Sequence, residues 1–257
     1  MKAVTIVIAF TILLIPSVFA ESLMDKLEIE IGKSVDAQIK DEYPVLNDPA
    51  MTAYIARLGD ELVANSSRKN LKYTYTILND NETVNAFAGP GGFIYVTTGL
   101  MRLCENNAEL MGVLAHEIAH VAHHDQMDAM GLGLGLTALA TVATGGSPEM
   151  VQAGVSVALG LIQNGYSRED EKEADLSAVD YLVGAGMQPW AMIDFFEKMK
   201  KKLGDVKGIE VYFSSHPSTD QRIKDIKAKI VKLGAAKVDD LPYGEEGFQK
   251  NIAKRLK

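Results

Sequence analysis

An apolar helix with a polar interruption constrains this chain more than any other feature. From Leu110 to Val121 the sequence is apolar except at three positions, and this pattern predicts a helix that lies in the core. The three exceptions fall in the run His116-Glu-Ile-Ala-His120. Residues four apart share one face of a helix, so the two imidazoles lie one turn apart on the same side. Because a buried polar group needs a partner, the run favours a bound metal ion over a core helix without a ligand.

The residue types in this run suit hydrolytic chemistry at zinc. Imidazoles are neutral ligands, so a Zn²⁺ ion held by His116 and His120 keeps enough charge to acidify a water molecule. Glu117 could accept that proton as general base and pass it to the leaving amine. The alternative is a helix with two surface histidines, which the apolar surroundings disfavour. The run therefore predicts a zinc-dependent peptide hydrolase with one Zn²⁺ per chain.

A catalytic zinc needs a third protein ligand. The long metzincin motif is excluded, because His123 and Gln126 stand where its glycine and third histidine would be. The remaining source is an acidic segment at the start of a later helix. Its carboxylates are Glu169, Glu171, Glu173 and Asp175.

The spacing within this acidic segment allows a division of roles. Glu171 and Asp175 are four apart, so one could bind zinc while the other supports a ligand histidine. Spacing alone does not separate Glu171 from Glu173. The alternative is a solvated acidic helix start, which the helix dipole favours.

Six segments together resemble the HtpX/CAAX-prenyl-protease type of zinc endopeptidase, a gluzincin family. They occur in the family's order across residues 25–232. The segments are Asn85-Ala-Phe-Ala88, Gly91-Gly-Phe-Ile-Tyr-Val96, Thr98-Gly-Leu100, His116-Glu-Ile-Ala-His120, Glu171-Lys-Glu-Ala-Asp175 and His216-Pro-Ser-Thr-Asp-Gln-Arg222. The resemblance implies that Glu171 is the third zinc ligand and that Asp175 supports a ligand histidine.

The resemblance also implies roles for His216 and Arg222. In relatives the histidine of the His-Pro pair lies near the metal, where it hydrogen-bonds the transition-state oxyanion or caps the zinc in a resting form. His216 is therefore a candidate catalytic residue. Arg222 would pair with Asp175 or Glu171 and fix the site. Without the family order, the two residues indicate only a loop turn and a solvated arginine.

Residues 91–96 are expected to form an edge strand beside the cleft. A substrate backbone can add to such an edge with little side-chain selectivity, which suits unfolded or extended polypeptides. The candidate substrate-binding residues are Asn85, Gly92, Phe93, Ile94 and Tyr95. Asn85 would anchor the substrate backbone; its alternative is an ordinary turn residue.

The whole pattern predicts a mainly α fold with a small β-sheet, of the α+β zincin type. The active-site helix is expected beside the sheet, followed by a helical second half. Helices are expected over residues 22–40, 48–65, 105–124, 168–184, 188–203 and 218–232, and strands over 71–78 and 93–98. Residues 21–232 are expected to form the metallopeptidase domain, and 233–257 a loosely attached polar tail.

Two apolar segments bear on where the protein acts. Residues 1–20 have the layout of a secretory signal peptide, with Lys2, an apolar run and Val18-Phe-Ala20; an uncleaved anchor is the alternative. Residues 131–162 form two apolar arms, expected as a buried helical hairpin, with a membrane or partner contact as the alternative. The net charge of −8 excludes a basic nucleic-acid footprint.

These features predict an exported, periplasmic endopeptidase that cuts unfolded, misfolded or misassembled envelope proteins. Two other functions stay open. One is a zinc-stabilised chaperone or assembly factor that uses the apolar hairpin. The other is a protease tethered to the membrane by its N-terminus.

Overall fold

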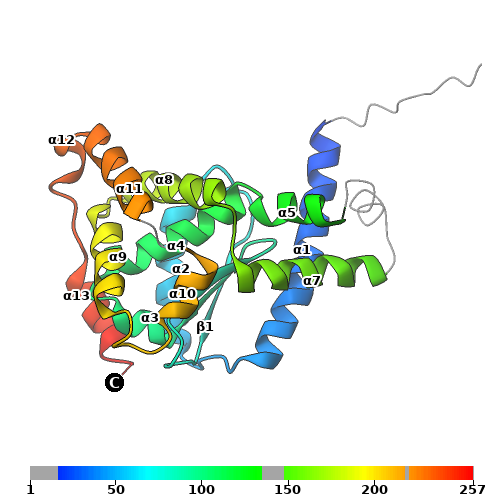
Figure 1. Ribbon diagram of the computed structural model, residues 1–257, viewed down its shortest axis with the longest axis horizontal. Helices are drawn as coiled ribbons and strands as arrows, with labels where there is room; N and C mark the ends of the chain where they lie inside the picture. The colour runs from blue at the N-terminus through cyan, green and yellow to red at the C-terminus, as the bar shows by residue number, and fades with distance from the viewer. Residues whose placement is uncertain (1–16, 135–147, 218–219, 257) are drawn as a thin grey trace, which may run out of the picture.

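Figure 1 shows the chain as a computed structural model, which describes residues 17–134, 148–217 and 220–256. Two helices come first, three strands follow, and the remaining elements that the structure describes are helices. The elements are α1 (Ser17–Glu42), α2 (Pro49–Val63), β1 (Thr74–Leu78), β2 (Ala86–Gly89), β3 (Phe93–Thr97), α3 (Thr98–Leu103), α4 (Asn107–Ala122), α5 (Asp125–Leu134), α7 (Pro148–Asn164), α8 (Arg168–Gly184), α9 (Trp190–Lys202), α10 (Ile209–Ser215), α11 (Asp220–Leu233), α12 (Ala235–Val238), α13 (Glu245–Phe248) and the π-helix η1 (Gln249–Ala253). The predicted fold class, mainly α with a small sheet, is confirmed.

The sheet has three strands in the order β1-β3-β2. β3 runs parallel to β1, with Thr74 opposite Phe93, and antiparallel to β2, with Ala86 opposite Val96. The expectation that residues 91–96 form the edge strand is therefore wrong, because β3 has a neighbour on both sides. The true edge beside α4 is the short strand β2.

A tight turn produces this arrangement. Gly91 and Gly92 both have positive φ, a conformation that glycine adopts without steric cost, and they fold β2 back onto β3. A Cβ on Gly92 would lie 2.9 Å from the carbonyl oxygen of Lys72, so the turn also has no room for a side chain. The turn thus fixes β3 in the centre and leaves one side of β2 without a strand neighbour among the described residues.

Helix α4 is the centre of the molecule. Every one of its residues is buried, and it contacts the sheet as well as α2, α8 and α9 (Figure 1). Asn106 starts the helix, since its side-chain oxygen accepts a hydrogen bond from the backbone N–H of Glu109 at 2.9 Å. The polar side chains of α4 are consequently held in a closely packed interior.

The far end of α4 is fixed by a buried charge cluster. Arg68 donates to the carboxylate of Glu28 on α1 and to the carbonyl oxygen of Val121 on α4. The same carboxylate accepts a hydrogen bond from the backbone N–H of Gly91 at 2.9 Å. Burial raises the pKa of Glu28, but His124, Arg68 and the Gly91 amide outweigh burial and lower it. One glutamate therefore joins α1, the turn before β3 and the C-terminal end of α4.

A second apolar cluster lies between α1, α7 and the sheet. Ile31 and Val35 of α1 pack with Val155 of α7 and with Phe87 of β2. Of the expected apolar hairpin 131–162, residues 135–147 lie outside the described residues, as do residues 1–16 of the expected signal peptide. Among the helices that the structure describes, none has the length and apolar character that a bilayer crossing requires.

The expectation of a loosely attached tail after residue 232 is wrong. Residues 235–253 are largely helical, and four apolar side chains from this part of the chain enter the main core. These are Val238, Phe248, Ile252 and Leu256. Phe248, Ile252 and Leu256 recur every four residues, so they share one face that packs inward although the segment is polar in composition.

Candidate metal centre

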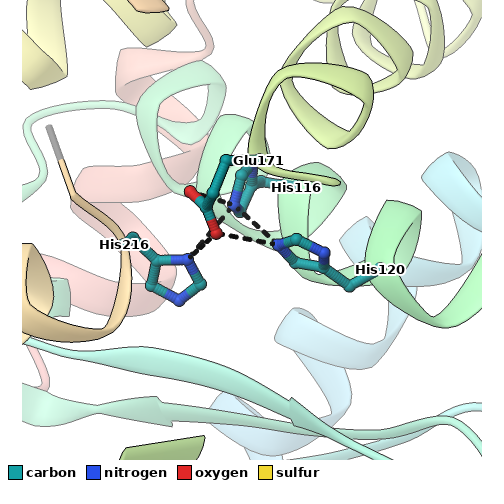
Figure 2. Close-up of side chains that lie close together, drawn as sticks. All are labelled: His116, His120, Glu171 and His216. Atoms are coloured by element: carbon teal, nitrogen blue, oxygen red, sulfur yellow. Dashed lines mark hydrogen bonds and ion pairs between the residues drawn. The ribbon is translucent and has the colours of Figure 1, made fainter. Parts of the chain in front are cut away.

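Four donor side chains from three parts of the chain converge beside α4 (Figure 2). His116 and His120 come from α4, Glu171 from the first turn of α8, and His216 from the end of α10. All four are buried, and their donor atoms lie within 4.8 Å of one another. The structure thus brings together the three sequence-predicted ligands and adds the predicted catalytic histidine to the same cluster.

The spacing of the donor atoms fits a tetrahedral ion. The Nε2 atoms of His116 and His120 are 3.0 Å apart, and His216 Nδ1 lies 3.3 Å from His116 Nε2. Glu171 Oε1 is 2.9 Å from His216 Nδ1 and 3.4 Å from His120 Nε2. Ligand bonds of about 2.0–2.1 Å in a tetrahedron imply donor separations of about 3.3 Å. The cluster can therefore hold one metal ion.

Each histidine of α4 has its second nitrogen against a carboxylate. His116 Nδ1 lies 3.0 Å from Asp175 Oδ1, and His120 Nδ1 lies 2.7 Å from Asp125 Oδ2. A carboxylate accepts a hydrogen bond, so these positions favour hydrogen on Nδ1 and leave Nε2 directed toward the cluster. Asp175 was predicted for this role. Asp125 was not, although it follows the motif by only five residues.

We expect Asp125→Ala to weaken metal binding by about 10- to 100-fold, because His120 would lose the group that fixes its ring and tautomer. Competition with a chromogenic chelator measures the affinity. Asp128→Ala is the matched control, since this exposed aspartate lies on the same helix. Equal affinities in the two variants would contradict the role of Asp125.

The carboxylate of Glu171 is the acidic group that enters the cluster. Ser167 and Asp170 form a capping box at the start of α8, which places Glu171 on the inner face one turn into the helix. Glu173, which spacing alone left as an alternative, is exposed. Burial opposes ionisation, yet His216 and His116 hold the pKa of Glu171 far below its usual range. Glu171 is therefore an anionic donor.

Arg222 supports both acidic groups of α8. Its Nε and one terminal nitrogen each lie 2.7 Å from an oxygen of Asp175, and the other terminal nitrogen contacts Glu171. The guanidinium also stacks on Phe196, 4.9 Å from the ring centre. Burial lowers the pKa of Arg222, but the two carboxylates raise it above its ordinary value, so the arginine is charged. The same ion pair keeps the pKa of Asp175 low.

The two histidines of α4 respond to these carboxylates. Burial lowers the pKa of His116, but Glu171 and Asp175 outweigh burial and raise it to about 10. The pKa of His120 is also raised, by Asp125 and Glu171 against burial and the neighbouring His116. A field that stabilises a cation on imidazole stabilises a metal cation in the same place, so the site is built for positive charge.

Glu117 is fully buried beside the donors and has both oxygens without a hydrogen-bond partner among the described residues. His216 Nε2 lies 3.4 Å from its Oε1. A buried carboxylate that accepts no hydrogen bond lowers the stability of a fold, because its desolvation is not compensated. Its position points to a partner that arrives from outside, such as water or substrate.

The position of His216 depends on a close backbone contact. Gly165, between α7 and α8, has positive φ, and a Cβ there would lie 1.9 Å from the carbonyl oxygen of Ser215. The next residue, Tyr166, stacks on His120 with ring centres 4.0 Å apart. The α7–α8 connection therefore touches both the metal-ligand helix and the residue before His216. Sequence reasoning missed Tyr166, because a single aromatic residue before an acidic helix carries no distinctive pattern.

The predicted substrate-binding residues of β3 do not lie at an open edge. Phe93 contacts Gly32 of α1, Ile94 belongs to the main core, and the Tyr95 hydroxyl donates to Asp36 at 2.8 Å. Gly92 lies in the turn. Asn85 differs from these four, because it directly precedes β2 and its buried side-chain oxygen has no hydrogen-bond partner among the described residues.

A family model and several similar proteins all point to one family of peptidases. The family model described as Peptidase family M48 matches residues 49–230. The chain is 32% identical to the Beta-barrel assembly-enhancing protease of Yersinia pestis over 210 residues, which is 78% of this chain and 43% of the relative. It is 28% identical to the protein of that name from Escherichia coli (strain K12) over 216 residues, covering 78% and 43%.

A shorter relative is covered more fully. Metalloprotease LoiP of Escherichia coli (strain K12) is 30% identical over 190 residues, which is 71% of this chain and 73% of the relative. By contrast, the chain spans less than half the length of the two beta-barrel assembly-enhancing proteases. The match over residues 49–230 contains the histidine helix, the acidic helix and His216. The chain therefore belongs to peptidase family M48 and is a metallopeptidase.

Proposed function

We propose that this protein is a zinc-dependent endopeptidase that cleaves extended segments of unfolded or misassembled envelope proteins. The observation that carries the proposal is the buried His116–His120–Glu171 cluster with the unpartnered Glu117 beside it. Two histidines and one carboxylate are a donor set that suits catalytic Zn²⁺, one ion per chain. Zinc bound there would polarise the scissile carbonyl and make water a stronger acid.

The chain's own residues would then divide the proton transfers. Glu117 takes a proton from the attacking water at a carboxylate oxygen and delivers it to the leaving amine nitrogen. His216, with Nε2 facing Glu117 at 3.4 Å, can donate a hydrogen bond to the oxyanion as the carbonyl carbon becomes tetrahedral. Asp125, Asp175 and Arg222 would position the ligands without touching the substrate.

The position of His216 also supports a resting form. Its Nδ1 lies among the other donors, so its ring takes a fourth position in the cluster. We infer that the imidazole must withdraw before a substrate carbonyl reaches the metal position beside Glu117. Such a form would be inactive because the His216 imidazole occupies the position that the substrate needs, and not because a catalytic group is missing.

The side of β2 that has no strand neighbour in the described part of the chain is where we place the substrate backbone. Ala86 and Ala88 are buried in this structure, so a peptide would reach this side only after the groups that cover it move. Asn85 accepts a hydrogen bond from the Thr97 N–H at 3.0 Å, so its backbone faces β3. Successive residues of an antiparallel strand direct their backbone N–H and C=O groups alternately toward and away from the neighbouring strand. The groups of Ala86 and Ala88 therefore point away from β3. An extended peptide can add there as a fourth strand, with the Asn85 side-chain oxygen accepting one of its N–H groups.

The envelope assignment and the periplasmic location rest on two observations. Residues 1–20 have the pattern of a secretory signal peptide. The relatives from Yersinia pestis and Escherichia coli are named for β-barrel assembly. A zinc-stabilised chaperone is the second candidate, favoured only by the large apolar content of residues 131–162.

Metal removal tests the proposal. We expect the purified protein to contain one zinc per chain and to cleave unfolded casein. Treatment with 1,10-phenanthroline should abolish cleavage, and added Zn²⁺ should restore it. Cleavage that survives complete zinc removal, shown by elemental analysis, would overturn the zinc mechanism. A zinc-loaded protein that prevents aggregation but cuts nothing would favour the chaperone.

A further inference from the structure

A groove lies beside β2 and extends to the residue before His216. Its volume is about 300 Å³, and its lining includes Asn85 and Phe87 from the β2 region and Ser215, which precedes His216. This volume is at the lower end of the range of ligand pockets, about 300–1,000 Å³, and suits one long side chain. A peptide strand on β2 would therefore direct a side chain into this groove.

The groove contains a buried polar atom that lacks a partner. Asn85 is 7% exposed, and its Oδ1 makes no hydrogen bond among the residues the structure describes. Leaving such an acceptor unpaired costs about 1–3 kcal/mol, which a peptide N–H would recover. The groove thus lacks a hydrogen-bond donor for the Asn85 side-chain oxygen. A peptide backbone that passed beside Asn85 would supply one.

Part of the groove wall is apolar, and most of these apolar residues come from helices. The apolar lining includes Leu159 and Ile162 of α7, Val211 of α10 and Phe87 of β2. The first two lie in the apolar segment 131–162, so part of that segment forms a wall of the groove. Apolar walls favour a side chain with several methylene groups.

The charged residues of the groove are acidic. Glu42, at the end of α1, and Asp80, after β1, both line it, and its lining contains no lysine, arginine or histidine. Hydrogen bonds from Thr83 and from the backbone N–H of Glu82 lower the pKa of Asp80 despite its desolvation, so its carboxylate is charged. The nearby Lys207 is paired with Glu82 at 2.6 Å. The rim therefore presents negative charge to a side chain that enters between the apolar walls.

We propose that this groove is a specificity pocket for a lysine or arginine side chain of the polypeptide substrate. The methylene stem would lie against Leu159, Ile162 and Phe87, and the cationic tip would reach Glu42 and Asp80. This inference rests on the proposed endopeptidase function. It adds a preference that backbone addition to β2 cannot supply, because main-chain hydrogen bonds do not distinguish side chains.

The first test maps the bonds that the zinc-loaded protein cuts in denatured casein, by mass spectrometry of the products. We expect lysine and arginine to be enriched at one fixed position relative to the cleaved bonds. Cleavage without such enrichment, or with apolar residues enriched instead, would overturn the pocket and leave the endopeptidase function standing. Absence of any zinc-dependent cleavage would overturn both.

The second test assigns the preference to the groove. Two fluorogenic peptides are built on the most frequent cleavage site and differ only in lysine or norleucine at the enriched position. We expect the ratio of their kcat/KM values to fall about fivefold in Glu42→Gln, the size of a strong exposed ion pair, and to weaken with added salt.

Asp41→Asn is the matched control for the second test, since Asp41 is the exposed neighbour of Glu42 on α1 and does not line the groove. Its lysine-to-norleucine ratio should equal that of the wild type. The inference fails if Glu42→Gln leaves the ratio unchanged, or if both variants lower it equally.

Discussion

Replacing Glu117 by glutamine should abolish peptide cleavage while the metal site stays intact. Glu117 takes no part in the hydrogen bonds that hold His116, His120 and Glu171, and its oxygens have no hydrogen-bond partner among the described residues. Glutamine keeps the shape of the side chain but does not accept a proton at neutral pH. Because a positioned general base contributes about 10²- to 10⁴-fold, kcat on unfolded casein should fall by that factor.

Zinc content and activity must be measured on the same preparation of this variant. We expect one zinc per chain in Glu117→Gln by elemental analysis and an unchanged unfolding midpoint. Glu173→Gln is the matched control, because Glu173 is an exposed glutamate of α8 near the same site. Unchanged cleavage by Glu117→Gln would refute the catalytic role, and loss of zinc would show that Glu117 holds the site together instead. Full rescue of a deletion strain by the inactive variant would support the chaperone function.

The largest stability effect is expected at Arg222. Changing it to methionine leaves the buried carboxylates of Asp175 and Glu171 without the guanidinium that contacts both. Removing one partner of a buried ion pair costs about 3–5 kcal/mol, because the remaining charge stays in a poorly solvated place. The free energy of unfolding from urea titration should fall by that amount, and metal affinity should fall with it because Asp175 would no longer be held against His116.

Two further variants separate geometry from charge in this effect. Arg222→Lys should recover only part of the loss, since one ammonium cannot make the paired contacts of the guanidinium. Arg57→Met removes an exposed arginine from its ion pair with Glu61 and should change the free energy of unfolding by less than about 1 kcal/mol. A loss at Arg222 no larger than that at Arg57 would show that the buried network contributes little.

Local patterns were sufficient for most helices. The acidic helix predicted over residues 168–184 spans Arg168–Gly184. Its capping box and its apolar inner face both depend on residues that are close together in the sequence, so the sequence alone was enough to predict it. The helix around His116 was likewise anticipated, since its apolar run and its polar interruption are local. Glu171 could not be chosen over Glu173 from spacing, because both lie in one acidic run and only the packing of α8 on α4 buries the former.

The order of strands was not available from local pattern. Residues 86–89 are a short run of small residues and one phenylalanine, too brief to show the alternation typical of a strand. Once this strand forms, it occupies one side of β3 and becomes the edge itself. The prediction for residues 91–96 failed because strand neighbours are decided by how the chain turns, here at Gly91 and Gly92, and not by the strand's own residues.

Asp125 was missed for a different reason. It follows His123 and His124, and the second of these has φ of 63°, so the chain changes direction between α4 and α5. That bend returns Asp125 to His120, a contact that helical spacing would not place there. His123 and His124 themselves lie away from the donors, with His123 Nε2 3.0 Å from the Ser177 hydroxyl.

The wide separation of the donors along the chain has a consequence for folding. His216 meets a ligand that is 45 residues away in sequence and another that is 100 residues away. Loops of this length must close before the cluster exists, so we expect it to form after the local helices are in place. A partly folded copy would then have no cutting site. If the protein cleaves unfolded polypeptides as proposed, a molecule that is still folding could not cut its own chain or that of its neighbours.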